Sequence, residues 1–338
     1  VPVTVDLSTN FFGPALPLGL FNKPTLQFLS IGTNEFADEF PATFILPEIR
    51  VLSLRQSVNV TGVLPTTIGE LTTLQNLDVF LCSLNGTLPT QLGNLAALQR
   101  FDGEFNFFTG QIPTELGNLV AIQSLNLNFN QLDGTLPAEI AFAANLIQLD
   151  FGFNFLTGTI PGEWGFLANL QGLNLEFNTL SGPIPDGFVG LAALRELELG
   201  TNGFSGTIPT ELGSLLQLQQ LELQNNTFTG TVPTELGNLV AMTSLDLSIN
   251  GFAGTIPSTL AQLTDLSKFL LRFASIKATA LRSLRVSAID TLLLWSNAIT
   301  GLAPLAICGL RPAPLETFET DCLVPNPPVV CSCCSVCR

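Results

Sequence analysis

The stretch GTIPTELGSLLQLQQLELQNNTFTGTVPTELGNL, residues 206–239, contains almost the same eight residues twice, 24 positions apart. Aligning the chain on one polar position extends this period in both directions. The aligned asparagines, each 24 residues after the last, are Asn106, Asn130, Asn154, Asn178, Asn202, Asn226 and Asn250. A fixed period indicates stacked repeats that form one elongated unit, whereas 338 residues would otherwise suggest two domains.

The residues around Asn130 show what one repeat is expected to do. Leu125 and Leu127 alternate with a period of two, so both point inward from a short strand. Asn130 lies where the chain turns inward, and its side chain can bond to the backbone of neighbouring turns. Gly134 permits a backbone conformation closed to other residues. Residues 114–119 predict a short helical turn on the outer side. Stacked coils of this kind form a parallel sheet, because no single coil can bury its leucines alone.

The full pattern, LxxLxxLxLxxNxLxGxIPxxLGxL, resembles the leucine-rich repeats of plant-type extracellular proteins, including receptor-kinase ectodomains and polygalacturonase inhibitors. The resemblance implies an α/β solenoid with a parallel β-sheet on the concave face, and short second strands and helical turns on the other sides. We expect about 13 coils over residues 1–306, with regular repeats over about 74–265 and an irregular coil at 266–288. We expect residues 307–338 to form a Cys-rich C-terminal cap and tail. Cys82 occupies an Asn position where the family tolerates a buried unpaired thiol.

The composition excludes several functions. A net charge of −15 argues against nucleic acid, because phosphate binding needs a basic face. The chain has no His, hence no Ser-His or Cys-His nucleophile pair, and its carboxylates recur at repeat spacing instead of converging on one cleft. No apolar run approaches the ~20 residues that span a bilayer. We therefore predict neither an enzyme nor a transmembrane segment, and no cofactor or metal site.

The cysteines and glycosylation sequons predict a secreted or cell-surface protein. Asn59, Asn85 and Asn225 begin Asn-x-Thr sequons. Six cysteines lie in the last 31 residues, namely Cys308, Cys322, Cys331, Cys333, Cys334 and Cys337. Cys308 and Cys322 are suitably spaced for a disulfide, and the last four could form two bridges or bind a soft metal. The tail also resembles the C-termini of secreted leucine-rich-repeat proteins of diatoms and related algae.

Function is expected in the strand positions that vary and face outward on the concave side. One column of them is acid or amide almost throughout, and beside it runs an apolar stripe of Leu81 and four phenylalanines. The predicted ligand-binding residues are Asp102, Phe105, Asn126, Phe129, Asp150, Phe153, Asn174, Phe177, Glu198 and Glu222. Such a face suits a cationic peptide, a glycan that stacks on the rings, or Ca²⁺-bridged attachment. The alternative is that the phenylalanines fold partly under the rim of each coil.

The sequence also carries features of three other functions. Pairs such as Thr157 and Thr159 form ranks like those of ice-binding solenoids, but Gln111, Asp133 and Pro183 interrupt the ranks, so we expect no thermal hysteresis. A role as a glycosidase-inhibitor-like defence protein is another alternative. Head-to-tail self-assembly is a third, because the first 48 residues are acidic and five basic residues cluster near the other end. These basic residues are Lys268, Arg272, Lys277, Arg282 and Arg285.

Overall fold

The computed structural model describes residues 3–272 and five strand segments beyond them, at 275–276, 291–293, 301–302, 317–319 and 329–330. The chain divides into two compact units, Val1–Leu170 and Gln171–Arg338, which we call unit 1 and unit 2. The predicted boundary at residues 306–307 and the six cysteines of the tail lie outside the described residues, as do Lys277, Arg282 and Arg285.

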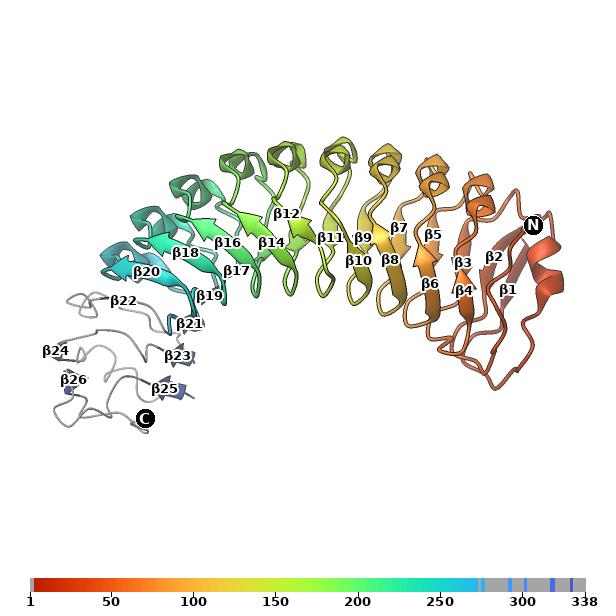
Figure 1. The fold of residues 1–338 in the computed structure, drawn as a ribbon, viewed down its shortest axis with the longest axis horizontal. Helices are drawn as coiled ribbons and strands as arrows, with labels where there is room; N and C mark the ends of the chain where they lie inside the picture. The colour runs from red at the N-terminus through yellow and green to blue at the C-terminus, as the bar shows by residue number, and fades with distance from the viewer. Residues whose placement is uncertain are drawn as a thin grey trace. The chain divides into compact units, whose positions relative to one another are not determined.

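Unit 1 is built on one parallel sheet to which each coil contributes one strand (Figure 1). Its strands, in spatial order, are β1 (Val3–Asp6), β2 (Leu26–Ser30), β3 (Val51–Ser53), β5 (Asn76–Asp78), β7 (Arg100–Asp102), β9 (Ser124–Asn126) and β11 (Gln148–Asp150). A second parallel sheet comprises β4 (Thr61–Val63), β6 (Ser83–Thr87), β8 (Phe107–Gln111) and β10 (Gln131–Asp133), and β12 (Thr157–Gly158) follows in the last coil. The helices are η1 (Leu18–Asn22), η2 (Thr66–Glu70), η3 (Thr90–Asn94), η4 (Thr114–Asn118), η5 (Ala138–Phe142) and η6 (Gly162–Phe166).

Unit 2 repeats the same arrangement. Its first sheet comprises β13 (Gly172–Asn174), β15 (Glu196–Glu198), β17 (Gln220–Glu222), β19 (Ser244–Asp246), β21 (Lys268–Leu270), β23 (Thr291–Leu293) and β25 (Thr317–Glu319). The second strands are β14 (Thr179–Gly182), β16 (Gly203–Gly206), β18 (Thr227–Gly230), β20 (Gly251–Gly254) and β22 (Ser275–Ile276), and β24 (Gly301–Leu302) pairs with β26 (Val329–Val330). The helices are η7 (Asp186–Gly190), η8 (Thr210–Ser214), η9 (Thr234–Asn238) and η10 (Ser258–Gln262).

The predicted solenoid fold is confirmed, and the predicted helical turns are short 3₁₀ helices. In each unit the helices lie along one side of the coils, away from the strands (Figure 1). From η2 on, each described helix is preceded by a proline in an extended conformation, as Pro137 is before η5. Proline fits there because its fixed φ suits the entry to a helical turn and its missing N–H is not needed. The leucines of the repeat, such as Leu125 and Leu127, form the buried core.

The repeated asparagines join each coil to the one before it, as predicted. Asn130 Nδ2 donates to the carbonyl oxygen of Gly103 in the preceding coil at 3.0 Å and to that of Leu127 in its own coil at 3.1 Å. Its Oδ1 accepts from the backbone N–H of Phe108, also in the preceding coil, at 3.0 Å. The side chain therefore satisfies backbone groups that neither sheet reaches. Gly134 has a φ of 74°, as its predicted role in the turn requires.

Candidate binding face

The sheet face of unit 1 is the outward side of β3, β5, β7, β9 and β11, together with the residues that follow each strand. Four aromatic side chains form a row across it, one from each of four consecutive coils. We call Phe80, Phe105, Phe129 and Phe153 the phenylalanine ladder. The rings of Phe105 and Phe129 stack with centroids 4.3 Å apart, and those of Phe129 and Phe153 with centroids 4.0 Å apart. Phe80 meets Phe105 edge to face at 5.9 Å.

The three stacked phenylalanines share an unusual backbone conformation. Phe105, Phe129 and Phe153 have φ values of 53°, 51° and 49°, in the left-handed region that bulky residues rarely adopt. Each lies one position before a buried asparagine, where the chain must turn inward. The turn thus holds the rings on the sheet face, with Phe105 38% and Phe129 36% exposed. The sequence pattern predicted this exposure, but nothing in the phenylalanine residues signals their positive φ.

The stacking determines which part of each ring a partner can reach. Phe129 lies between two nearly parallel rings, at interplanar angles of 10° to Phe105 and 14° to Phe153. Both of its π-faces are therefore covered by neighbouring rings. Its exposed part is the ring edge, which is apolar and weakly positive. The ladder consequently presents a stripe of ring edges, not a platform of ring faces.

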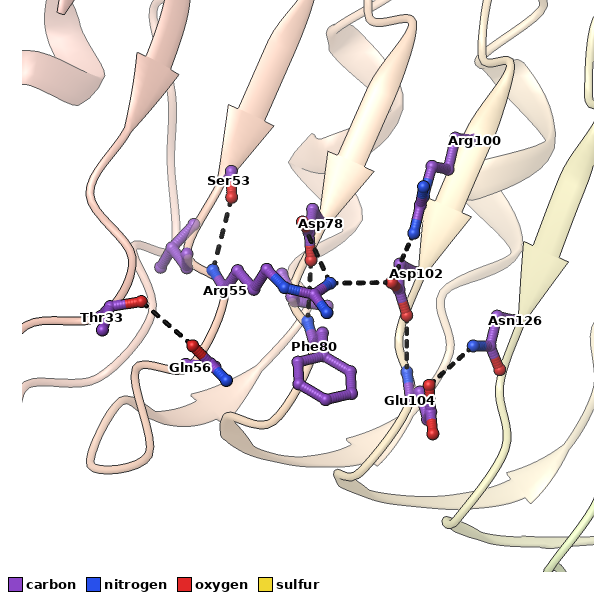
Figure 2. A network of polar contacts seen from close by, with 12 residues as sticks. Thr33, Ser53, Arg55, Gln56, Asp78, Phe80, Arg100, Asp102, Glu104 and Asn126 are labelled. Atoms are coloured by element: carbon purple, nitrogen blue, oxygen red, sulfur yellow. Dashed lines mark hydrogen bonds and ion pairs between the residues drawn. The ribbon is translucent and has the colours of Figure 1, made fainter. Parts of the chain in front are cut away.

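Arg55 lies at the N-terminal end of the ladder and connects it to the acidic column (Figure 2). Its guanidinium carbon lies over the ring of Phe80, 4.0 Å from the centroid. Its Nη1 is 3.2 Å from Asp102 Oδ2 and 3.6 Å from Asp78 Oδ2. Arg100 Nη2 also bonds to Asp102 Oδ2, at 3.0 Å. One carboxylate thus receives two guanidinium groups.

The exposure expected for the acidic column is wrong at Asp102, which is only 3% exposed. The acidic column that contains Asp102 has no basic residue, and the two cations that contact Asp102 come from other columns. Arg100 lies two residues earlier on the same strand, so both side chains point to the same face. Arg55 lies 47 residues earlier, in the column that continues with Phe80. The two-residue spacing between Arg100 and Asp102 is enough to predict the first ion pair from the sequence. The ion pair with Arg55 can be predicted only if the register between coils is known.

Two asparagines continue the polar contacts beside the ladder. Asn126 Nδ2 donates to Glu104 Oε2 at 2.9 Å (Figure 2), and Asn128 Nδ2 donates to Asp150 Oδ2 at 3.1 Å. Asn126 Oδ1 also accepts from the backbone N–H of Asn128 at 3.0 Å, so the predicted residues Asn126 and Asp150 share one network with Glu104 and Asn128, whose part in it the sequence did not predict. Asn128 is only 7% exposed, and its Oδ1 has no hydrogen-bond partner among the described residues.

Burial raises the pKa of two carboxylates on the sheet face of unit 1. Desolvation raises the pKa of Asp78, although the Phe80 backbone N–H and Arg55 act against the shift. Desolvation also raises the pKa of Glu104, against the hydrogen bond from Asn126. Removal from water disfavours the charged form in both cases. The face therefore holds carboxylates that gain from a nearby positive charge.

Cys82 is a buried free thiol, as predicted. Its Sγ donates to the carbonyl oxygen of Leu54 in the preceding coil at 3.3 Å, so it replaces one of the bonds that asparagine makes elsewhere. Burial raises the pKa of this thiol to about 12. The buried thiol therefore stays protonated and unreactive near neutral pH.

The sheet face of unit 2 carries the remaining predicted residues in a different setting. Glu198 accepts from Gln220 Nε2 at 2.8 Å. Glu222 is 6% exposed, so its expected exposure is also wrong, and it accepts from Ser244 at 2.7 Å and from Lys268 at 3.1 Å. Phe177 is exposed and has a φ of 50°, and Asn174 ends β13. The residues at the same repeat position in the next three coils, Thr201, Asn225 and Ile249, also have a positive φ.

The other predicted sites have not been tested by what the structure describes. The sequon asparagines Asn59, Asn85 and Asn225 are exposed, and their glycosylation stays a prediction. Lys268 already bonds Glu222, and its role in assembly with Arg272 stays a prediction. No three His, Cys, Asp or Glu side chains in the described part of the chain are placed to hold a metal ion. Within that same part, no helix has the length and apolar character needed to cross a membrane.

Comparisons with known proteins agree with this architecture. Leucine-rich-repeat family models match residues 144–204, and residues 121–142 and 217–239. A leucine-rich-repeat protein of Leptospira interrogans is 30% identical with a TM-score of 0.71, and the match covers 91% of this chain and 75% of that one. The chain belongs to the leucine-rich-repeat proteins. No curated protein sequence matches it.

Receptor ectodomains are also similar to this chain. The Arabidopsis receptor kinase HAESA, solved with the peptide hormone IDA and the co-receptor SERK1, is 30% identical with a TM-score of 0.84. The match covers 90% of this chain and 51% of the solved HAESA chain, so this chain spans about half the length of that chain. A plant ice-binding protein is 24% identical with a TM-score of 0.59, over 74% of this chain and 81% of that one. That likeness shows the fold alone.

Proposed function

We propose that this chain is an extracellular, non-enzymatic recognition protein that binds a protein partner along the sheet face of unit 1. The observation that carries the proposal is the phenylalanine ladder. Its three stacked rings are fixed by the turn before a buried asparagine, and Phe105 and Phe129 remain more than one third exposed. Aromatic anchors on a rigid surface carry much of the binding energy in protein interfaces. The similarity to a receptor solved with a peptide hormone supports the same proposal.

The energetics of the ladder show that its stacked rings add little to folding, since a positive φ recurs at this repeat position in the described coils from Thr9 to Ile249 and belongs to the scaffold. A bulky residue in the left-handed region costs about 1–3 kcal/mol, and the structure retains three such residues in consecutive coils. Stacking returns about 0.5–1.5 kcal/mol per pair. The ladder therefore contributes little to folding, while its rings are already ordered before a partner arrives. Order in the free state lowers the entropy cost of binding.

Binding by the double variant Phe129→Ala/Phe153→Ala tests the proposal. Wild-type and variant protein are used to capture partners from the native extracellular fraction, with identification by crosslinking and mass spectrometry. We expect the variant to keep its circular dichroism spectrum and to lose the partner. Phe142→Ala is the matched control, because Phe142 is another phenylalanine of unit 1, 71% exposed, at the end of η5. Equal capture by all three proteins would move the site elsewhere.

Ice binding remains the less favoured function. Gln111 in β8 pairs in register with Asp133 in β10. Two of the residues predicted to interrupt the threonine ranks therefore lie side by side. An ice-binding rank would need regularly spaced threonines at that place. We expect the purified protein to show the thermal hysteresis of an inert protein at equal concentration.

A further inference from the structure

Arg55 shows how a guanidinium group occupies the sheet face of unit 1. It lies 4.0 Å over the ring of Phe80 while its Nη1 contacts the carboxylates of Asp78 and Asp102 (Figure 2). The contact combines attraction to the negative π-face with ion pairing, and both act best on a planar cation. The chain itself therefore demonstrates the kind of group that this face holds.

The next position in the Phe80 column has a carboxylate that forms no ion pair among the described residues, although Arg55 acts on it from a greater distance. Glu104 follows Phe80 by 24 residues, and it takes part in none of the ion pairs that the described residues form. Its side chain accepts from Asn126, a neutral amide. Near the ladder, the carboxylates of Asp78, Asp102, Glu104 and Asp150 outnumber the guanidinium groups of Arg55 and Arg100. The face thus retains an excess of negative charge at Glu104.

Asn128, one coil further along the same column, provides an independent sign of a missing donor. Its Nδ2 bonds to Asp150, which fixes the orientation of the amide, and its Oδ1 has no hydrogen-bond partner in the described part of the chain although the residue is 93% buried. Buried polar atoms are nearly always hydrogen-bonded, so an unpaired one needs an explanation. Because neighbouring strands are about 4.8 Å apart, one ligand group with several donors can serve both Glu104 and Asn128.

The ring geometry discriminates between a peptide and a glycan. A sugar stacks on the face of an aromatic ring, but both faces of Phe129 are covered by Phe105 and Phe153. The exposed ring edges form an apolar stripe across the coils. Its two ring-to-ring steps, of 4.3 and 4.0 Å, span the length of two to three residues of an extended chain, which rises about 3.3 Å per residue.

We infer that the partner of this face is an extended peptide segment with an arginine or lysine side chain, whose cation binds between Glu104 and Asn128 while its neighbours lie along the edges of Phe105 and Phe129. This inference rests on the proposed function and specifies its ligand. Glu104 supplies the charge, Asn128 supplies the second acceptor, and the ladder supplies apolar contact. The cation occupies the place, one coil on, that corresponds to that of Arg55.

A peptide array with one variable position tests the inference. The probes are extended octapeptides, randomised except at a central position that carries arginine, lysine, citrulline or norleucine. Citrulline keeps the shape of arginine without its charge. We expect the wild-type protein to bind the best arginine or lysine peptides at least ten-fold more tightly than their citrulline and norleucine counterparts. We also expect this preference to decrease as salt rises from 50 to 500 mM, because ions screen exposed charges.

Glu104→Gln locates the preference on the protein. The substitution keeps the shape of the side chain and an acceptor for Asn126, and we expect the arginine peptides to bind it only as tightly as citrulline peptides do. Glu163→Gln, which removes one exposed charge in η6, is the matched control and should retain the full preference. An unfolding midpoint equal to that of the wild type confirms that both variants are folded.

The outcomes separate this inference from the proposed function. Equal binding of arginine and citrulline peptides, with loss of both in Phe129→Ala/Phe153→Ala, overturns the cation site and leaves the binding face intact. Binding to a glycan array without binding to any peptide overturns the inference outright. A preference for arginine that Glu104→Gln leaves unchanged also overturns it. If Phe129→Ala/Phe153→Ala binds peptides and captured partners as well as the wild type does, the proposed function itself is overturned.

Discussion

Two rows of phenylalanines with the same 24-residue spacing have opposite surroundings. In unit 1, Phe105, Phe129 and Phe153 stack at 4.0–4.3 Å with their edges toward solvent. In unit 2, Phe204, Phe228 and Phe252 are nearly parallel at 6.3 Å and are fully buried. Each ring of the first row precedes the repeated asparagine by one position, and each ring of the second row follows it by two, inside the second strand. The place within the repeat, and not the residue type, therefore decides whether a ring belongs to the core or to the surface.

The largest effect should come from the buried row. Phe228→Ala leaves a cavity in unit 2 between Phe204 and Phe252, and we expect a loss of about 3–5 kcal/mol in the free energy of unfolding. Chemical denaturation measures the loss, and hydrogen exchange should show that amides of unit 2 lose the most protection. A loss below 1 kcal/mol would mean that this row does not form a packed core.

Asn130→Ala should have the next largest effect, and it tests what holds the exposed row in place. The substitution leaves the N–H of Phe108 unpaired inside unit 1, at a cost of about 1–3 kcal/mol. The carbonyl oxygen of Gly103 loses the bond from Asn130 but keeps the one from Asn106 Nδ2. Because the same turn holds Phe129, the near-ultraviolet dichroism of the stacked rings should also weaken. An unchanged ring signal would indicate that stacking alone positions the row.

An alkaline titration should perturb unit 1 through Cys82. The folded thiol has a pKa of about 12, above its ordinary value of 9.0, so the stability that it contributes is present below pH 9 and is lost as the pH rises toward 12. We expect unit 1 to lose about 1 kcal/mol more at pH 10 in the wild type than in Cys82→Ser. Denaturation at pH 8 and pH 10 measures the difference. Equal losses in the two proteins would contradict the burial of the thiol.

The smallest effect should come from Phe129→Asn. Asparagine adopts a positive φ readily, so relief of backbone strain offsets the lost stacking, and we expect a change within about 1 kcal/mol. Phe129→Ala loses the stacking without the same relief and should be the less stable of the two. Denaturation midpoints of both variants decide the order. A loss near that of Phe228→Ala would erase the distinction between the two rows.

Residues that act within one coil could be predicted from the sequence. Leu125, Asn130 and Gly134 each have a role that follows from the local turn, and the structure confirms all three. The exposure of the phenylalanine stripe also followed from its place beside the strand. These features need only the period and the stereochemistry of one repeat.

Features that depend on pairs of coils could not be predicted in the same way. The burial of Asp102 results from Arg55, two coils earlier, and from Arg100 on its own strand. The positive φ of Phe129 is imposed by the closing of the coil, and in its column only Asn225 is a residue type that signals such a turn. The unpaired Oδ1 of Asn128 likewise depends on Asp150 in the next coil.

The buried asparagines also bear on how such a chain could change in evolution. The Asn130 side chain bonds its own coil and the coil before it, so an in-frame duplication of one coil supplies the same side-chain partners again. Duplicating a coil of unit 1 would lengthen the phenylalanine ladder by one ring, in a step of about 4 Å, without redesign of the remaining core. The length of the segment that we propose the ladder to contact can thus change in discrete increments, by duplication of coils instead of by point mutation.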